Sequence, residues 1–195
     1  MNWTEDSQME YKEMYKIILA EYEQVFEKVD QRGLREFMDT VKNHQRIFLI
    51  GVGREGMATK AFAMRLMHMG KEVHWIWDDT TPNIQSGDLV IATLGDGKIG
   101  HIDYVCKQAK KAGGFIYVVT GSPSGKTAAK VADKVFFIPA AVYRGTDEVV
   151  MSSQPMGNLF EQCLLIIFDM IIMTIVEETP GLDFEKMSKH HRNVE

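Results

Sequence analysis

The stretch Arg46-Ile-Phe-Leu-Ile-Gly51-Val-Gly53-Arg54-Glu55-Gly56 decides how this sequence is interpreted. A short apolar run that ends in glycine is typical of a buried parallel strand followed by a tight turn. Glycines let such a turn approach a ligand closely, and the amides at the start of the next helix favour an anion. The stretch therefore predicts a strand, a ligand-binding loop and a helix.

The same alternation continues along the chain. Further strands are expected at 73–77, 88–93, 115–120 and 135–138, and helices at 57–69, 101–112 and 124–132. Amphipathic helices at 8–30 and 33–43 precede the first strand, and a loop at 140–155, a long helix at 157–178 and a polar tail at 184–195 follow the last. Strands that alternate with helices predict a doubly wound α/β sandwich with the loops after each strand on one edge.

Composition limits the class of protein. A length of 195 residues, with 45% apolar and 25% charged residues, favours one soluble domain over 1–195, divided into helices 1–44, core 45–178 and tail 179–195. A net charge of −5 without a basic patch argues against nucleic acid. The polar N-terminus is unlike a signal peptide, and the run 164–176 is shorter than the ~20 residues of a membrane span. Two isolated cysteines fit a reducing cytoplasm.

Two more glycine-rich loops follow the third and fourth strands. One is Leu94-Gly95-Asp96-Gly97-Lys98, and the other is Thr120-Gly-Ser122-Pro-Ser-Gly125. Glycine loops at adjacent strand ends suit a small ligand in the crevice better than an extended dinucleotide. Capping of the next helix near Ser124 accounts equally well for the hydroxyl side chains of the third loop.

The first loop also allows a different interpretation. Gly51, Gly53 and Gly56 match the dinucleotide-binding spacing G-x-G-x-x-G, and Asp78 follows the next strand, where a ribose-binding acid would lie. A tight strand-to-helix turn without a ligand needs the same glycines. A nucleotide-binding domain therefore stays open as an alternative.

Longer segments resemble one known family. Residues 51–70, Thr81-Pro82 with 87–92, residues 155–162 and the tail 191–195 are similar, in this order, to the 6-phospho-3-hexuloisomerases of the sugar isomerase (SIS) domain family. The resemblance implies a flavodoxin-like, three-layer fold with a five-stranded parallel sheet, a dimer of dimers and active sites shared between subunits. It also implies isomerisation of a sugar phosphate through an enediol, with no metal or other cofactor.

The resemblance implies roles for two residues in catalysis. Glu161 matches the family's glutamate and is the candidate base; the alternative is a first-turn acid that complements the helix dipole, which would lower its pKa. His191 matches the family's tail histidine and would act across a subunit interface in ring opening or proton relay. The alternative is a solvated tail residue, and His190 leaves the match open by one position.

The first two glycine loops depart from the family's pattern. The family reads G-x-G-R-S-G where this chain has Glu55, and S-G-S-G-E-T where it has Leu-Gly-Asp96-Gly-Lys98-Ile. The replaced hydroxyls ordinarily hold the sugar phosphate. Carboxylates about 4 Å from a phosphate would repel it by ~4 kcal/mol per unit pair at an effective dielectric of ~20.

We therefore predict that Glu55 and Asp96 occupy the phosphate site as built-in anions. Alternatively both point outward, and backbone amides with Thr120, Ser122 and Lys98 hold the phosphate. Arg54 is expected to orient substrate oxygens or to pair with Asp96 or Glu55. The predicted substrate-binding residues are Gly51, Gly53, Arg54, Glu55, Gly95, Asp96, Gly97, Lys98, Thr120 and Ser122. A sugar-phosphate isomerase is the first hypothesis, and a non-catalytic sugar-binding or regulatory module is the second.

Overall fold

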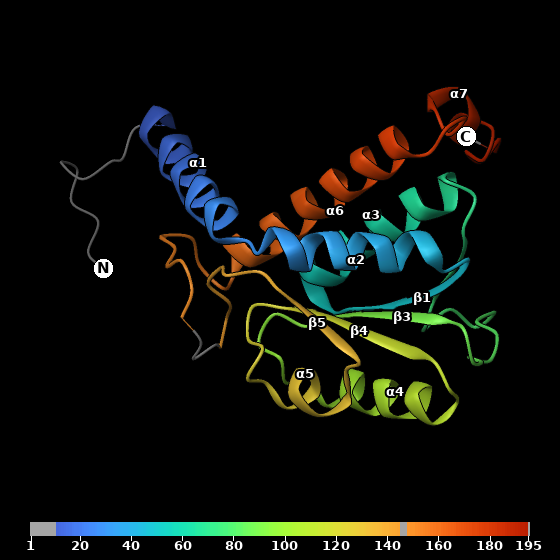
Figure 1. Cartoon of the computed structure of the whole chain (residues 1–195). Coiled ribbons are helices and arrows are strands. Elements are labelled where there is room, and N and C mark those ends of the chain that lie inside the picture. Colours follow the sequence, from blue (N-terminus) through green and yellow to red (C-terminus); the bar gives the residue numbers. More distant parts are fainter. Residues whose placement is uncertain (1–10, 145–147, 195) are drawn as a thin grey trace.

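The computed structural model describes residues 11–144 and 148–194 (Figure 1). One parallel sheet has the order β2-β1-β3-β4-β5, the flavodoxin-like order. Its strands are β1 Arg46–Ile50, β2 Glu72–Trp75, β3 Leu89–Thr93, β4 Phe115–Thr120 and β5 Lys134–Phe137. All of β3 is buried, because helices cover both faces of the sheet. The α/β three-layer sandwich with five parallel strands is confirmed.

Helices form the two outer layers (Figure 1). One face of the sheet is covered by α2 Gln31–Asn43, α3 Gly53–His68 and α6 Asn158–Glu178, and the other by α4 Gly100–Lys111 and α5 Lys126–Val131. Helix α1 Tyr11–Lys28 lies across α6 on the outside of the first layer, and the short α7 Phe184–Ser188 ends the chain. Residues 8–10 of the predicted first helix, and 145–147 of the predicted loop, lie outside the described residues.

The larger core lies between the sheet and the layer of α2, α3 and α6. Aromatic rings pack within this layer and against the sheet. Phe62 of α3 stacks on Phe168 of α6 at 4.1 Å between centroids, and Phe37 of α2 stacks on Phe136 of β5 at 5.8 Å. Burying each such side chain contributes roughly 1.5–3 kcal/mol. This packing gives α6 a fixed position above the edge of the sheet where the glycine loops lie.

The structure shifts many predicted boundaries by one to four residues; strand β2, for example, ends at Trp75 and not at 77, and α5 begins at Lys126 and not at 124. Helix α2 begins at Gln31, not 33, because the Asp30 carboxylate accepts hydrogen bonds from the amides of Arg32 (3.2 Å) and Gly33 (3.0 Å). The predicted polar tail contains α7. Helix α3 begins at Gly53, not 57, so part of the first glycine loop is helical and Glu55 lies in the first turn.

Helix α6 extends beyond the apolar run 164–176 at both ends. Among the described residues it is the one helix that could cross a membrane by length and composition, since it has 21 residues. The helix expected at 157–178 is present with its start shifted by one residue, and as a whole it passes this test although its run 164–176 is shorter than a membrane span. Half of its most apolar stretch is buried against the rest of the protein. A core helix of a soluble protein has the same properties, so this feature is weak evidence for a membrane span.

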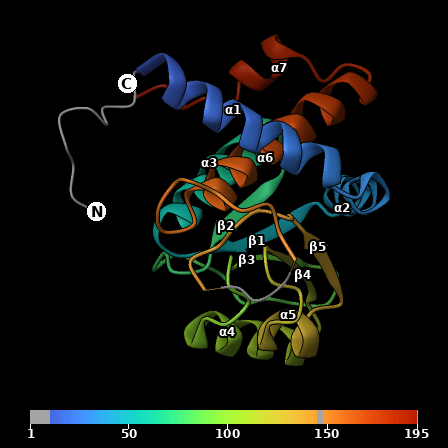
Figure 2. The same ribbon diagram turned by 90° about the vertical axis from the view of Figure 1, so that its left-hand side faces the viewer.

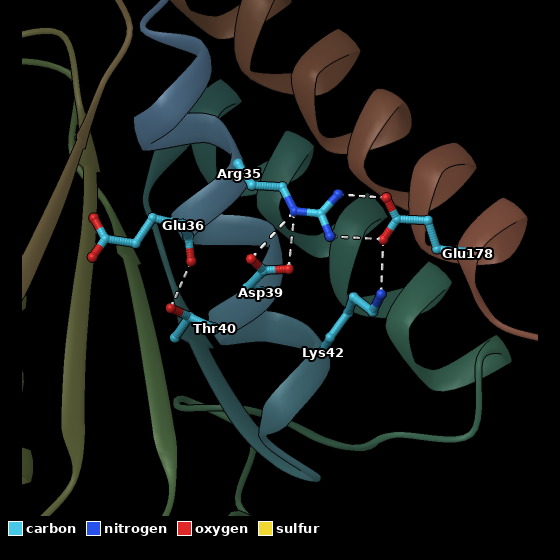
Figure 3. A network of polar contacts seen from close by, with 6 residues as sticks. All are labelled: Arg35, Glu36, Asp39, Thr40, Lys42 and Glu178. Carbon is cyan, nitrogen blue, oxygen red and sulfur yellow. Dashed lines mark hydrogen bonds and ion pairs between the residues drawn. The ribbon is translucent and has the colours of Figure 1, made fainter.

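A network of charged side chains fastens the C-terminal end of α6 to α2 (Figure 3). The Glu178 carboxylate is held by both outer nitrogens of Arg35 and by Lys42 Nζ at 2.8 Å, and these bonds lower its pKa. Arg35 also contacts Asp39, one turn further along α2. Such exposed pairs contribute little individually. The network joins α2 to the end of α6 opposite to the one that carries Glu161.

Candidate functional site

A cavity of about 240 Å³ opens at the carboxyl edge of the sheet, between the first two glycine loops and the start of α6. Its described lining is Val52, Gly53, Arg54, Glu55, Gly95, Asp96, Ile99, Val142, Tyr143, Met156, Gly157, Phe160 and Glu161. Ligands of open α/β folds bind where the strand order reverses, which here is between β1 and β3. The cavity lies at that point, and it brings together six of the predicted site residues.

The glycine spacing of the first loop is explained by packing. A Cβ atom on Gly51 would lie 2.3 Å from Thr93 Oγ1, and one on Gly56 would lie 2.8 Å from the Gly51 carbonyl. These contacts let α3 approach β1 and β3 closely. Gly51 itself does not line the cavity. The match to the dinucleotide pattern therefore has a structural cause that requires no nucleotide.

The second and third loops are joined backbone to backbone. A Cβ atom on Gly97, which has φ +66°, would lie 2.5 Å from the Ser122 carbonyl. The Thr120 hydroxyl donates to the Gly95 carbonyl (3.1 Å) and accepts from the Ser122 amide (3.0 Å). Gly97, Thr120 and Ser122 thus join the loops behind the cavity and do not line it. The alternative that hydroxyl side chains of the third loop cap the next helix near Ser124 is wrong, since Gly125 is the N-cap residue of α5 and no side chain caps that helix.

Glu55 points inward. Glu55 is only 9% exposed, and its Oε2 accepts a 2.7 Å hydrogen bond from the Gly95 amide. Burial raises the pKa of Glu55 to about 8; the Gly95 bond opposes this rise, and the charges of Asp96 and Glu161 add to it. Burial thus outweighs the favourable field of the helix N-terminus. The raised pKa favours the protonated carboxyl group at neutral pH, and the group engages the amide of Gly95 at the cavity wall.

Asp96 behaves differently. Its Oδ1 accepts a 3.0 Å hydrogen bond from the amide of Lys98, two residues on, so the carboxylate caps its own loop while still lining the cavity. The Lys98 side chain is exposed and is not part of the lining. Of the two acids that replace hydroxyls, only Glu55 reaches across to the neighbouring loop.

Arg54 pairs with Glu161. Its Nε lies 2.8 Å from Glu161 Oε2, so the expected pairing with Asp96 or Glu55 is wrong. The contact is not a hydrogen bond in its geometry, since this buried Oε2 has no hydrogen-bond partner among the described residues. Burial raises the pKa of Glu161 and Arg54 opposes the rise, with a net upward shift. Burial therefore offsets the lowering that a helix N-terminus favours, and the carboxylate is suited to take up a proton.

Known proteins share this architecture and much of this sequence. No family model matches the chain. The 3-hexulose-6-phosphate isomerase of Bacillus subtilis (strain 168) is 36% identical to this chain, over 82% of this chain and 85% of that protein. The enzyme of the same name from Mycobacterium gastri is 35% identical, over 86% of this chain and 83% of that protein. The chain belongs to the 3-hexulose-6-phosphate isomerase family. A solved Methanococcus jannaschii protein, whose structure infers the same molecular function, is 28% identical with a TM-score of 0.80 over 94% of this chain and 99% of its own.

The family's tail histidine lies far from the cavity within one chain. The His191 ring stacks on His68 at 5.2 Å between centroids, while His190 bonds the His68 carbonyl at 2.8 Å. Helix α3 begins at the cavity and ends at His68, so at 1.5 Å per residue the histidines lie roughly 20 Å away. Figure 1 accordingly has α7 and the C-terminus at the opposite end of the molecule from the loops. His191 and Glu161 do not meet within one chain.

The remaining wall of the cavity comes from the predicted loop and the start of α6. Val142, Tyr143, Met156 and Phe160 are apolar or aromatic. For Val142 and Tyr143 the length of the predicted loop was the only sequence signal, whereas Met156 and Phe160 lie in the segment 155–162 that resembles the family. Met156 has φ +61° and is followed by Gly157 with φ +81°, where a Cβ atom would lie 2.8 Å from the Tyr143 amide. Both ends of the loop therefore meet at the cavity. No group of metal-ligating side chains occurs among the described residues.

Proposed function

We propose that this member of the 3-hexulose-6-phosphate isomerase family isomerises a sugar phosphate by a metal-independent enediol mechanism with Glu161 as the base. The base takes the proton from the hydroxyl-bearing carbon next to the carbonyl, which leaves an enediol across the two carbons. The proton returns to the former carbonyl carbon, and the hydroxyl proton moves to the former carbonyl oxygen. No atom is gained or lost, and no oxidant is needed.

The Glu161–Arg54 pair is the observation that carries this proposal. Glu161 lines the cavity with its side chain 19% exposed, and its raised pKa suits proton transfer near neutral pH. Arg54 is the one cation among the described lining residues. It can hold the base in place and stabilise negative charge on the enediol oxygens.

A coupled isomerase assay tests the base. Glu161→Gln keeps the shape of the side chain but cannot accept a proton, so we expect kcat to fall by at least ~10²-fold. Glu177→Gln, an exposed acid at the other end of the same helix, is the matched control and should retain wild-type activity. Unchanged activity in Glu161→Gln would remove Glu161 from the mechanism.

A second candidate function is a non-catalytic sugar-binding or regulatory module. The hydrogen bond from Gly95 to Glu55 favours it, because that amide is no longer free for the anionic group of a substrate. The two candidates separate in one experiment, in which binding is followed by thermal shift and turnover by the coupled assay. Binding of fructose 6-phosphate or a related sugar without turnover, in the wild type as in Glu161→Gln, would favour the module.

The phosphate site of this chain has diverged through Glu55. A phosphate carries about −1.5 to −2 charges near neutral pH, so it competes poorly with a carboxyl group that already accepts the Gly95 bond. We expect fructose 6-phosphate to raise the melting temperature of a Glu55→Ser/Asp96→Ser variant more than that of the wild type. The difference should be larger at pH 9 than at pH 6.5, because Glu55 ionises between them. Equal shifts in both proteins would overturn the idea.

The assembly is proposed to be a cytoplasmic dimer of dimers in which a neighbouring subunit supplies His191. Exposed apolar side chains on two adjacent helices support association: Met57 and Met64 on α3, and Leu165 and Met173 on α6. If sites are shared, mixing Glu161→Gln with His191→Ala subunits should restore part of the activity that each has lost. A monomer in light scattering, or no restoration, would contradict this assembly.

A further inference from the structure

The buried carboxylate of Glu21 joins the outer helix α1 to the loop that walls the cavity. Glu21 is 6% exposed. Its Oε2 accepts hydrogen bonds from Ser152 Oγ (2.7 Å) and Gln154 Nε2 (3.0 Å), and its Oε1 accepts one from the Ser153 amide (2.6 Å). Three donors from consecutive residues thus converge on one carboxylate that is about 130 residues away in the sequence.

The contact is built for a charged carboxylate. Burial by itself would raise the pKa of Glu21, but the bonds from Gln154, Ser152 and Ser153 more than offset it, so its pKa lies below the usual value. Charge-assisted hydrogen bonds are roughly twice as strong as neutral ones. A second bond orients Ser152, since its Oγ also accepts a hydrogen bond from the backbone amide of Gln154 at 3.0 Å. Segment 152–154 is therefore held in place by hydrogen bonds to one carboxylate, that of Glu21.

This segment leads directly into the site. Residues 155–157 follow it, and within them Met156 and Gly157 adopt the positive φ angles that bring both to the cavity wall. Asn158 then starts α6, and Glu161 lies in the first turn. At its other end the loop is fixed by the Ala140–Val150 bridge, with bonds from Ala141 N to Val150 O and from Val150 N to Pro139 O. Figure 2 shows the loop facing the viewer, with α1 passing above it.

We propose that Glu21 is a positioning residue of the active site: it fixes segment 152–154, so that Met156, Gly157 and the first turn of α6 hold Glu161 and the cavity wall in the reactive arrangement. This role rests on the proposed isomerase function for its effect on rate, but not for its effect on the loop. Met156 is a strained position, and such positions persist only when the surrounding structure holds them. Glu21 supplies that hold from outside the site.

The test compares Glu21→Gln with wild type in loop dynamics and in rate. The amide side chain replaces one acceptor oxygen by a donor and removes the negative charge, so the charge-assisted bonds to segment 152–154 are weakened. We expect faster amide hydrogen exchange in 150–157 and a fall in kcat/KM of about tenfold to a hundredfold, since small misplacements of reacting groups have effects of this size. Glu21→Asp keeps the charge and should recover part of both. Glu23→Gln, an exposed neighbour on α1, is the matched control.

The outcomes are distinguishable. Ser152→Ala, which deletes one donor on the loop side, provides a variant that leaves α1 unchanged and should show the same changes at smaller size. Unchanged amide exchange in 150–157 of Glu21→Gln overturns the positioning role. Faster exchange in Glu21→Gln with a wild-type kcat/KM overturns it as well, provided that Glu161→Gln is inactive. If Glu161→Gln is itself fully active, the proposed function fails, and the exchange data alone then decide whether Glu21 holds the loop.

Discussion

Raising the pH from 5 to 9 should destabilise this protein, and Glu55 is the reason. Its carboxyl group has a pKa of about 8 in the folded chain against an ordinary value of 4.5. At 1.36 kcal/mol per pKa unit, the difference corresponds to at most about 5 kcal/mol. Between these two values the folded protein holds a proton that the unfolded chain has lost, so stability falls as the pH rises. The contribution is complete below pH 4.5 and gone above pH 8.

Urea unfolding at several pH values measures this effect. For the wild type we expect the free energy of unfolding to fall by several kcal/mol between pH 5 and 8 and then to level off. Glu55→Gln retains the Gly95 contact through its amide oxygen but cannot ionise, so its stability should be much less dependent on pH. The difference between the two proteins isolates Glu55, because other groups such as His68, whose pKa is lowered, titrate in both. Measurements at one protein concentration avoid a contribution from assembly.

Parallel pH profiles for wild type and Glu55→Gln would refute the reasoning. Such a result would mean that Glu55 is solvated or turned outward. It would also remove the argument that this carboxyl group competes with a phosphate at the Gly95 amide. A profile that rises with pH would contradict even the direction of the shift.

Three further predictions concern the frame of the site. Gly97→Ala should lower the free energy of unfolding in urea by more than ~2 kcal/mol, because strain at φ +66° is ~1–3 kcal/mol and the new Cβ would lie 2.5 Å from the Ser122 carbonyl. Gly53→Ala is the control, since Gly53 has φ +55° with open space around it, and it should cost less. Equal losses in the two variants would contradict the packing argument. Phe168→Ala should lose roughly 3–5 kcal/mol, because it empties the stack on Phe62; a loss below 1 kcal/mol would mean that this stack is not part of the core. Asp30→Ala should lose about 1 kcal/mol by removing the cap of α2, which thermal melting followed by circular dichroism would detect; an unchanged melting temperature would argue against the cap.

The raised pKa of Glu55 changes the electrostatics that the sequence predicts. Two ionised carboxylates would repel a phosphate strongly, yet burial raises the pKa of Glu55 to about 8, so its negative charge is largely absent at neutral pH. Arg54 is engaged by Glu161 and offsets little of what remains. The divergence of this site should thus be mild in acid and pronounced in alkaline solution. A sugar phosphate can remain a substrate of this chain at neutral pH.

The sequence by itself determined the framework. Apolar runs such as 47–50 and 89–92 predict buried strands because a strand covered on both faces favours apolar side chains at every position. Glycine after a strand marks a turn because only glycine tolerates the close approach found at Gly51. These are local relations between residue type and backbone. They fixed the order of the elements and the edge where the cavity lies.

Only the tertiary structure decided what individual side chains do. Glu55 proved to point inward to Gly95, Arg54 to pair with Glu161, and His191 to lie at the other end of its own chain. Sequence spacing cannot rank such partners, because several acids lie within reach of one arginine and helix packing selects among them. The contact of Glu21 with 152–154 has no local signal at all. The contact exists because α1 packs against α6 beside the loop. That packing depends on the burial of apolar side chains throughout the core.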